Sequence, residues 1–296
     1  MWFKNLYFFK FDSDFSLSAE ELHEQLANKP FTPCSPTQRE SLGWVAPLGK
    51  NADSFTHASN NYILLTLARQ ERLLPATVVR EELAERMAEI EVKEDRKVRG
   101  KEKKDLLEAI EFELLPRAFT RTQKMDAWID KKGQWMVVNT SAANRAEALA
   151  DLLRKTLGAL PVSLPDTETT PMTTMTKWLS DGVLPVPFVL GQECELVSQQ
   201  DDKSKVIFRN HDLLADEVQS HLTAGKFVSK LAIEWDEKIS FVLTEDLQIK
   251  KLKFLDVMDE VMEENDPQSH EEQLDIEFAL MTGEVSNLWG QLLKVV

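Results

Sequence analysis

The feature that most constrains the fold is the alternation of apolar and polar residues toward the C-terminal end of the chain. Residues 227–256 read FVSKLAIEWDEKISFVLTEDLQIKKLKFLD, with Ile239, Phe241 and Leu243 at every second position. Alternation of this kind is typical of antiparallel strands that bury one face of a sheet. We therefore expect a β-hairpin here, in a protein whose core includes a sheet.

Other segments have the periodicity of helices. SAEELHEQLAN begins with Ser18 and Glu21 at the spacing of a capping box. Residues 142–157 predict an amphipathic helix that Gly158 ends. Asp212 or a neighbour is expected to cap a further helix, ADEVQSHLTAGK. Strand and helix patterns mix without regular βαβ alternation, so the predicted class is α+β, with antiparallel hairpins and amphipathic helices.

The length of 296 residues favours two regions over one. The best linker candidate, 159–176, contains three prolines and six threonines. The expected organisation has an N-terminal α+β region, a linker-like segment and a C-terminal α+β region, at 1–160, 161–176 and 177–296. Within them we expect a basic helical junction, a hairpin and an acidic segment, at 93–104, 114–140 and 256–277.

Charge is distributed unevenly along the chain. The stretch RKVRGKEKK, residues 96–104, has a local charge of +5, whereas the whole chain carries −15. Apolar residues recur at helical spacing before and after it, up to Ile90 and again from Leu106. The stretch is therefore expected to join two helices, or to lie within one long helix, and to project into solvent. An acidic average argues against nucleic acid, but binding depends on where the charge lies.

Two interpretations of this stretch stay open on pattern alone. It can be a solvated junction, with Glu94–Lys97 and Asp95–Arg99 as helical ion pairs. It can also be a patch that contacts phosphates. Further along, we expect Arg117, Phe119 and Arg121 to share one face of a strand. An exposed aromatic residue between two arginines suits contact with DNA, whereas a buried Phe119 would belong to a core or a subunit interface.

Signatures of catalysis are absent from the sequence. It has no GxSxG, HExxH, GxGxxG or phosphate-loop motif, and its five histidines lack ligand spacing. We predict no enzyme activity, no metal and no cofactor. The two cysteines, Cys34 and Cys194, lie far apart, and no apolar run is long enough for a membrane span, which favours a cytoplasmic protein. The acidic residues of 256–277 have the spacing of a solvated helix face.

Several short segments, taken in order, resemble the RdgC family of recombination-associated bacterial proteins. They are MWFKNL at the start, FTPC at 31–34, GWVAPLG at 43–49, LLPRAFTR at 114–121, LTAGKFVSKLAIEW at 222–235 and LMTGE at 280–284. None is a chemical signature by itself. Their ordered occurrence along nearly the whole chain makes the resemblance specific.

The resemblance implies a non-enzymatic DNA-binding protein of the nucleoid, largely independent of sequence. Two elongated α+β subunits of this family form a ring-shaped homodimer whose basic channel encircles duplex DNA and limits the access of RecA. Single-stranded DNA is a further candidate ligand. Family residues implicated in binding or ring closure correspond to Arg96, Phe119 and the segment 209–212, RNHD, in which Arg209 is the only fixed positive charge.

Together, pattern and resemblance give one set of candidate residues. Phe119 is expected at the dimer interface, or alternatively as a wedge against DNA. The expected phosphate contacts are Arg96, Lys97, Arg99, Lys101, Lys103, Lys104, Arg117, Arg121 and Arg209. The alternative function is an acidic scaffold that binds proteins and not DNA, and an acid-rich metal nuclease is a third, weaker candidate.

Overall fold

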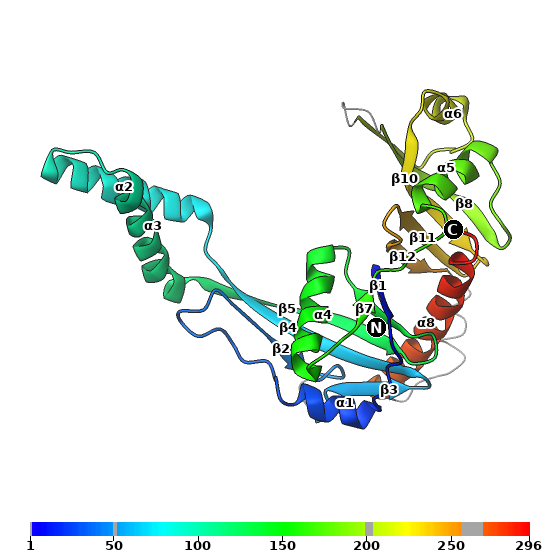
Figure 1. Ribbon diagram of the computed structural model, residues 1–296, viewed down its shortest axis with the longest axis horizontal. Coiled ribbons are helices and arrows are strands. Elements are labelled where there is room, and N and C mark those ends of the chain that lie inside the picture. Colours follow the sequence, from blue (N-terminus) through cyan, green and yellow to red (C-terminus); the bar gives the residue numbers. More distant parts are fainter. Residues whose placement is uncertain (1, 50–51, 199–203, 256–268) are drawn as a thin grey trace.

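The computed structural model describes residues 2–49, 52–198, 204–255 and 269–296, and it shows an elongated, curved chain. An arm that ends in two helices extends to the left in Figure 1, and the C-terminal strands and helices rise on the right. A concave side lies between these two ends. The predicted α+β class is confirmed, with helices packed against a large antiparallel sheet.

One sheet runs through the described residues. Twelve strands belong to it, and the main path has the order β2-β4-β5-β6-β1-β12-β11-β10-β8-β9, with β3 on β4 and β7 on β1. The first six strands are β1 (Leu6–Phe11), β2 (Glu40–Val45), β3 (Thr56–Ser59), β4 (Tyr62–Leu73), β5 (Phe119–Asp130) and β6 (Trp135–Asn139). The others are β7 (Val162–Ser163), β8 (Phe188–Val197), β9 (Lys205–Arg209), β10 (Phe227–Trp235), β11 (Ile239–Thr244) and β12 (Ile249–Phe254).

The hairpins predicted from alternation are present. Strands β10 and β11 pair antiparallel from Lys230↔Thr244 to Trp235↔Ile239. Strands β5 and β6 form the predicted hairpin within 114–140, with Ala127 opposite Val138. The alternating apolar residues of β11 all point into the core, as their period of two requires.

Strand β1 connects the two halves of the sheet. Leu6 is paired with Asn139 of β6 on one side and with Ile249 of β12 on the other. Its neighbours Phe3 and Phe8 belong to the same buried cluster as the C-terminal strands. The hydrogen-bonded sheet therefore continues across the expected boundary between the two regions, and the division at 161–176 stays a prediction.

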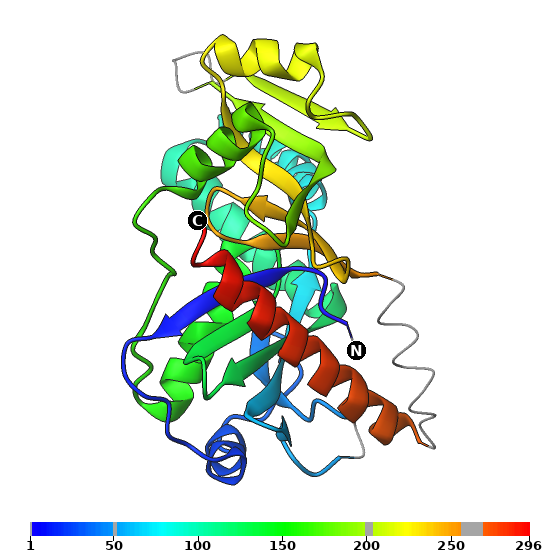
Figure 2. The ribbon, with the colours of Figure 1, turned by 90° about the vertical axis from the view of Figure 1, so that its right-hand side faces the viewer.

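Helices cover both faces of the N-terminal half of the sheet (Figures 1 and 2). The long α8 (His270–Leu292) crosses one face, where the ring of Trp289 stacks on Phe8 with 3.7 Å between centroids. The helices α1 (Ala19–Leu26) and α4 (Ala143–Leu157) cover the other face. Apolar side chains from both helices are buried there with those of the strands.

Local signals at helix ends are mostly confirmed. Ser18 and Glu21 form both hydrogen bonds of the capping box at the start of α1. Gly158 follows α4 with φ +83°, a conformation that glycine adopts without a steric penalty. The prediction for α6 (Asp216–Thr223) was wrong, because its N-cap is Ala215, without a side-chain cap. Asp212 instead accepts from the backbone N–H of Leu214.

Two segments differ from their expected structure. Residues 171–176 of the linker-like stretch are the first turns of α5 (Pro171–Asp181), in which Met175 is buried. Most of the acidic segment lies outside the described residues, and its last part begins α8. There the solvated-face expectation fails at one position, because Glu277 is buried and accepts from Gln273 of the preceding turn.

The arm is formed by β4 and β5, with β2 alongside β4 as far as Glu71, and it has a helical hairpin at its end. Strands β4 and β5 pair over their full length, from Tyr62↔Asp130 to Leu73↔Phe119. Beyond them, α2 (Ala76–Glu94) and α3 (Gly100–Leu114) bury a small apolar cluster, and η1 (Leu115–Arg117) leads back to β5. Arg72 attaches this end to the strands, because its guanidinium donates to the carbonyls of Leu115, Pro116 and Ala118.

A buried carboxylate in the C-terminal half has a strongly shifted pKa. Glu195 of β8 accepts from Lys230 Nζ at 2.8 Å, from the Ser229 hydroxyl at 2.9 Å and from Lys205 Nζ at 3.2 Å. Burial alone raises the pKa of Glu195, but these hydrogen bonds outweigh it and lower the pKa to about 2. The ionised carboxylate therefore stabilises the folded state.

This shift predicts a pH-dependent loss of stability. The pKa of Glu195 falls from 4.5 to about 2 on folding, so its contribution is complete above pH 4.5 and lost as the pH falls toward 2. At 1.36 kcal/mol per unit this amounts to about 3 kcal/mol. In urea unfolding at pH 7, the free energy of unfolding of Glu195→Gln should be lower than that of the unmodified protein by about this amount. The difference between the two proteins should become smaller as the pH falls below 4.5. The exposed Glu24→Gln is the control. A deficit that does not change with pH would contradict the prediction.

Candidate nucleic-acid interface

The basic stretch forms the turn between α2 and α3 and the first turn of α3. Helix α2 ends at Glu94 and is followed by the C-cap residue Asp95, which has a left-handed backbone with φ +48°. The expected solvent-facing junction is only partly confirmed, because Val98 is 3% exposed and its N–H donates to Glu91. This apolar side chain and hydrogen bond fix the turn, while the charged side chains around it point outward.

Arg96 is held by two carboxylates of the same turn. Its Nε donates to Glu94 at 2.6 Å, and its two Nη atoms donate to both oxygens of Glu102 at 2.6 Å. The hydrogen bonds with Glu102 and then Glu94 raise the pKa of Arg96, and the pKa of Glu102 is lowered by the same pair. The expected pairs Glu94–Lys97 and Asp95–Arg99 are replaced, because the helix ends before their spacing can apply.

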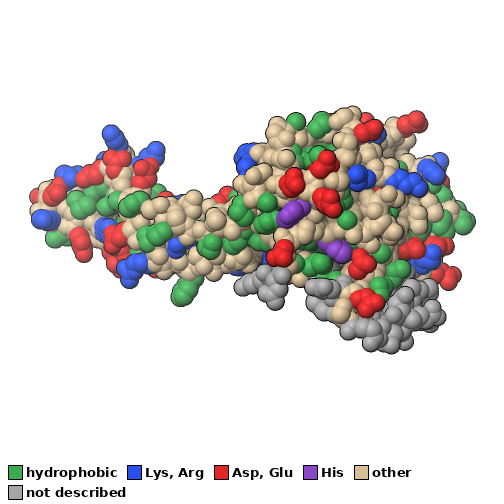
Figure 3. Space-filling model, turned by 90° about the horizontal axis from the view of Figure 1, so that it is seen from below, with side chains coloured by type: hydrophobic (Ala, Val, Ile, Leu, Met, Phe, Trp, Pro, Cys, Tyr) green, Lys and Arg blue, Asp and Glu red, His purple; other side chains and the backbone are tan. Residues whose placement is uncertain are grey.

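The candidate cations separate into two groups by their ion pairs. Five have a carboxylate within 4.0 Å: Arg96, Lys97, Lys104, Arg121 and Arg209. Four are exposed with no such partner among the described residues: Arg99, Lys101, Lys103 and Arg117. The four cations of the second group can contact phosphates without first breaking an ion pair with a carboxylate. Figure 3 shows acidic and basic side chains intermixed at this end of the molecule.

Phe119 lies at the start of β5, opposite Leu73 of β4, and is 85% exposed. It is therefore not a core residue. The expectation that Arg117, Phe119 and Arg121 share a strand face was wrong for Arg117, which belongs to η1. Arg121 lies on β5 and donates from Nε to Glu71 on the neighbouring strand at 3.0 Å, which lowers the pKa of Glu71.

Other apolar side chains of the arm are exposed, including Leu73, the strand partner of Phe119. Phe112 of α3 is 68% exposed, and Leu73 and Val78 are exposed where β4 leads into α2. Exposed apolar groups that cluster on one element are typical of interaction surfaces. The end of the arm thus combines apolar groups with the four unpaired cations named above.

Arg209 lies at the opposite end of the sheet. It closes β9, the strand at the outer edge of the C-terminal half, and its Nε is 3.8 Å from Glu193 of β8. Next to it, Asn210 has φ +50° and His211 lies beside Glu217. The fold of the chain therefore does not bring segment 209–212 together with the basic stretch.

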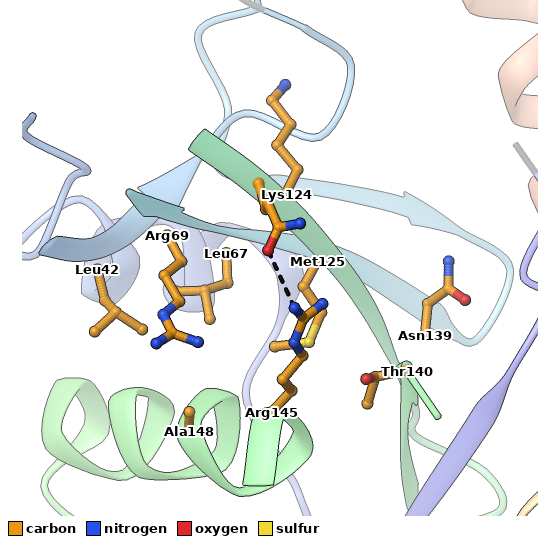
Figure 4. A pocket seen from close by; sticks show the side chains of 10 residues that line it. Leu42, Leu67, Arg69, Lys124, Met125, Asn139, Thr140, Arg145 and Ala148 are labelled. Atoms are coloured by element: carbon orange, nitrogen blue, oxygen red, sulfur yellow. Dashed lines mark hydrogen bonds between the residues drawn. The ribbon is translucent and has the colours of Figure 1, made fainter. Parts of the chain in front are cut away.

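A group of residues that pattern analysis missed lies between the arm and α4. Arg69 of β4, Gln123 of β5 and Arg145 of α4 surround a pocket there (Figure 4). Arg145 donates to the side-chain oxygen of Gln123 at 3.2 Å. Arg69 and Gln123 are direct partners in the β4–β5 register. No local spacing signals this grouping, because only the strand register and the packing of α4 bring the three together.

Within the described ranges, no three His, Cys, Asp or Glu side chains are grouped so that they could hold a metal ion. Over the same residues, no helix has the length and apolar character needed to cross a bilayer.

The fold and the surface define an elongated α+β protein whose arm presents apolar side chains and unpaired cations at its end. The chain belongs to the RdgC family, since that family's model, described as "Putative exonuclease, RdgC", matches residues 1–296. The resemblance seen in the ordered motifs is thereby confirmed.

Curated relatives agree with this assignment. Each is called "Recombination-associated protein RdgC". The relative from Colwellia psychrerythraea is 41% identical over 99% of this chain and 95% of its own length. The one from Aeromonas hydrophila is 43% identical over 97% of this chain and 94% of its own. The one from Proteus mirabilis is 34% identical over 100% of this chain and 98% of its own. The family is thus one of recombination-associated proteins.

Proposed function

We propose that this protein binds DNA without sequence preference, as a ring-shaped homodimer that encircles the duplex and limits recombination by RecA. The observation that carries the proposal is Phe119, which is 85% exposed at the start of β5, two residues after the exposed Arg117 and at the foot of the helical hairpin whose far end has the other unpaired cations. An isolated, fully exposed phenylalanine is unfavourable in water, and burial against a second subunit removes that cost. The same contact would place cations from both subunits close to one another.

The curved shape supports the ring. Each subunit contributes an arm end and a C-terminal end, with the concave side between them (Figure 1). Two such subunits related by a two-fold axis can close both gaps, and every contact then occurs twice. An acidic chain with net charge −15 can still bind DNA in such an assembly, because cations face the enclosed duplex while excess acids remain outside.

We further propose that the protein has no catalytic activity and works by occupying DNA in the cytoplasm, at the nucleoid. The relatives' names place them in recombination, and a bound ring would exclude a strand-exchange filament from the same duplex. Single strands can enter the same channel, with fewer phosphates to contact. Direct contact with RecA is not required by this mechanism.

Binding to unrelated duplexes tests the proposal. We expect gel shifts of similar affinity for duplexes of different sequence, because phosphate contacts carry no sequence information. If a ring contacts about six phosphates, log affinity should fall with log salt concentration at a slope of about −5. The labelled duplex should remain intact in parallel incubations with Mg²⁺ or Mn²⁺. Lack of binding at low salt, or an affinity that does not depend on salt concentration, would refute the DNA clamp. Shortened DNA strands would refute the non-enzymatic role.

A further inference from the structure

The pocket between α4 and the sheet is a second cationic feature, separate from the end of the arm. It encloses a cavity of about 60 Å³, several times the roughly 10–15 Å³ that one water molecule needs. Figure 4 shows Arg69 from the sheet and Arg145 from α4 extending into the space between these two layers. Leu67 and Met125 form its apolar floor, whereas the ammonium group of Lys124 points away.

The two guanidinium groups differ in their partners. Arg69 is held in place by Glu40, whose Oε2 lies 2.8 Å from its Nη2, and Glu71 lies 3.9 Å away. Glu71 is itself paired with Arg121. Arg145 donates only to the neutral side chain of Gln123, and no carboxylate lies within ion-pair distance of it among the described residues. Arg145 therefore has no ion pair with the described residues of the pocket, and its charge acts only at longer range on Glu71, whose pKa it helps to lower.

The position of Arg145 is not one that stability alone would select. It lies in the first turn of α4, a turn that contains no acidic residue. Positive side chains in a first turn oppose the helix dipole, whereas bound anions are favoured there. Thr140 lines the same pocket and accepts from the N–H of Ala142, which leaves its own hydroxyl hydrogen to donate. The pocket thus offers several donors and a positive charge to an oxygen-rich anion.

We propose that this pocket binds a phosphate group, and that the group belongs to the backbone of bound DNA. The planar guanidinium of Arg145 can donate two parallel hydrogen bonds to phosphate oxygens, with Arg69 and Thr140 completing the site. The first turn of α4 is directed toward the concave side of the molecule (Figure 1), where the proposed ring would hold its duplex. The source of the phosphate therefore rests on the proposed function, whereas the phosphate site itself does not.

The test compares Arg145→Gln with Arg154→Gln, an exposed arginine two turns further along the same helix and outside the pocket. Duplex binding is measured by fluorescence anisotropy over a series of salt concentrations. Arg145→Gln should weaken binding by about 3- to 10-fold and make the salt slope less negative by about 0.9 for each occupied pocket. Arg154→Gln should match the unmodified protein, and Arg145→Lys should retain part of the affinity.

A second experiment uses inorganic phosphate in place of DNA. At constant ionic strength, replacing chloride by phosphate should raise the melting temperature of the unmodified protein more than that of Arg145→Gln, because the general stabilising effect of phosphate is common to both proteins. If duplex binding is unaffected while the rise in phosphate is reduced, the site takes free phosphate and the DNA source is refuted. If both readouts are unaffected, the site is refuted while the DNA clamp stands. If neither the unmodified protein nor any variant binds DNA, the DNA clamp is refuted. The melting temperatures in phosphate are then the only test of the pocket.

Discussion

Replacing Phe119 with serine is expected to shift the protein from dimer toward monomer. The side chain is 85% exposed in one subunit, so its removal costs the isolated fold little. Aromatic anchors at the centre of an interface contribute about 2–4 kcal/mol each, and losing one raises a dissociation constant about 30- to 700-fold. Because the substitution removes the anchor from both subunits, the dimer dissociation constant should rise by at least that factor. Sedimentation velocity over a range of concentrations, with circular dichroism to confirm folding, measures this change.

The control and the alternative role of Phe119 can be read from the same samples. Leu164→Ser also removes an exposed apolar side chain, but from the segment between α4 and α5, and should leave the dimer intact. Phe119→Leu should keep part of the interface. If Phe119→Ser sediments as the unmodified protein does and yet loses DNA affinity, the residue is a wedge against DNA and the interface role is wrong.

The second large effect is expected from the unpaired cations of the arm. Changing Arg99, Lys101 and Lys103 together to glutamine removes three charges from each subunit without breaking an ion pair among the described residues. We expect duplex affinity to fall by about 100-fold or more near 150 mM salt, uniformly across sequences. The salt slope should become less negative by about 0.9 for each lost phosphate contact. Anisotropy titrations at several salt concentrations measure both quantities.

A matched variant separates local contact from total charge. Changing Lys10, Arg154 and Lys155 to glutamine alters the net charge equally, on exposed positions of β1 and α4. Equal losses of affinity in the two triple variants would mean that DNA affinity depends only on the net charge of the protein. That result would contradict phosphate contacts at the arm. Arg96→Gln should have a smaller effect than Arg99→Gln, because Glu94 and Glu102 already occupy Arg96.

Much of the fold could be predicted from local patterns. The capping box at Ser18, the helix end at Gly158 and the alternation of β11 depend on residues within a few positions of one another. The pairing of Leu6 with Ile249 could not be predicted in this way, because periodicity identifies strands but not their neighbours. Sequence also could not show that a single sheet continues through both halves of the chain.

The candidate interface was predicted in part. Phe119 and the basic stretch were identified, since exposure follows from a break in apolar periodicity and the resemblance supplied a role. The ion pairs of Arg96 were missed, because they depend on a left-handed residue, Asp95, that turns the chain back. The pocket of Arg69 and Arg145 was missed because these residues meet only through tertiary packing.

The sheet narrows along the arm, which makes the arm a lever. Between Thr66↔Asp126 and Leu73↔Phe119, β5 has no second neighbour among the described strands, β2 accompanies β4 only as far as Glu71, and the eight residue pairs span about 24 Å. Over that length, each degree of rotation at the base moves the far end by about 0.4 Å. Since Arg72 fixes the helices to the strands, they travel as one body. A proposed ring could thus admit DNA by twisting its arms, with the packing of its helices unchanged.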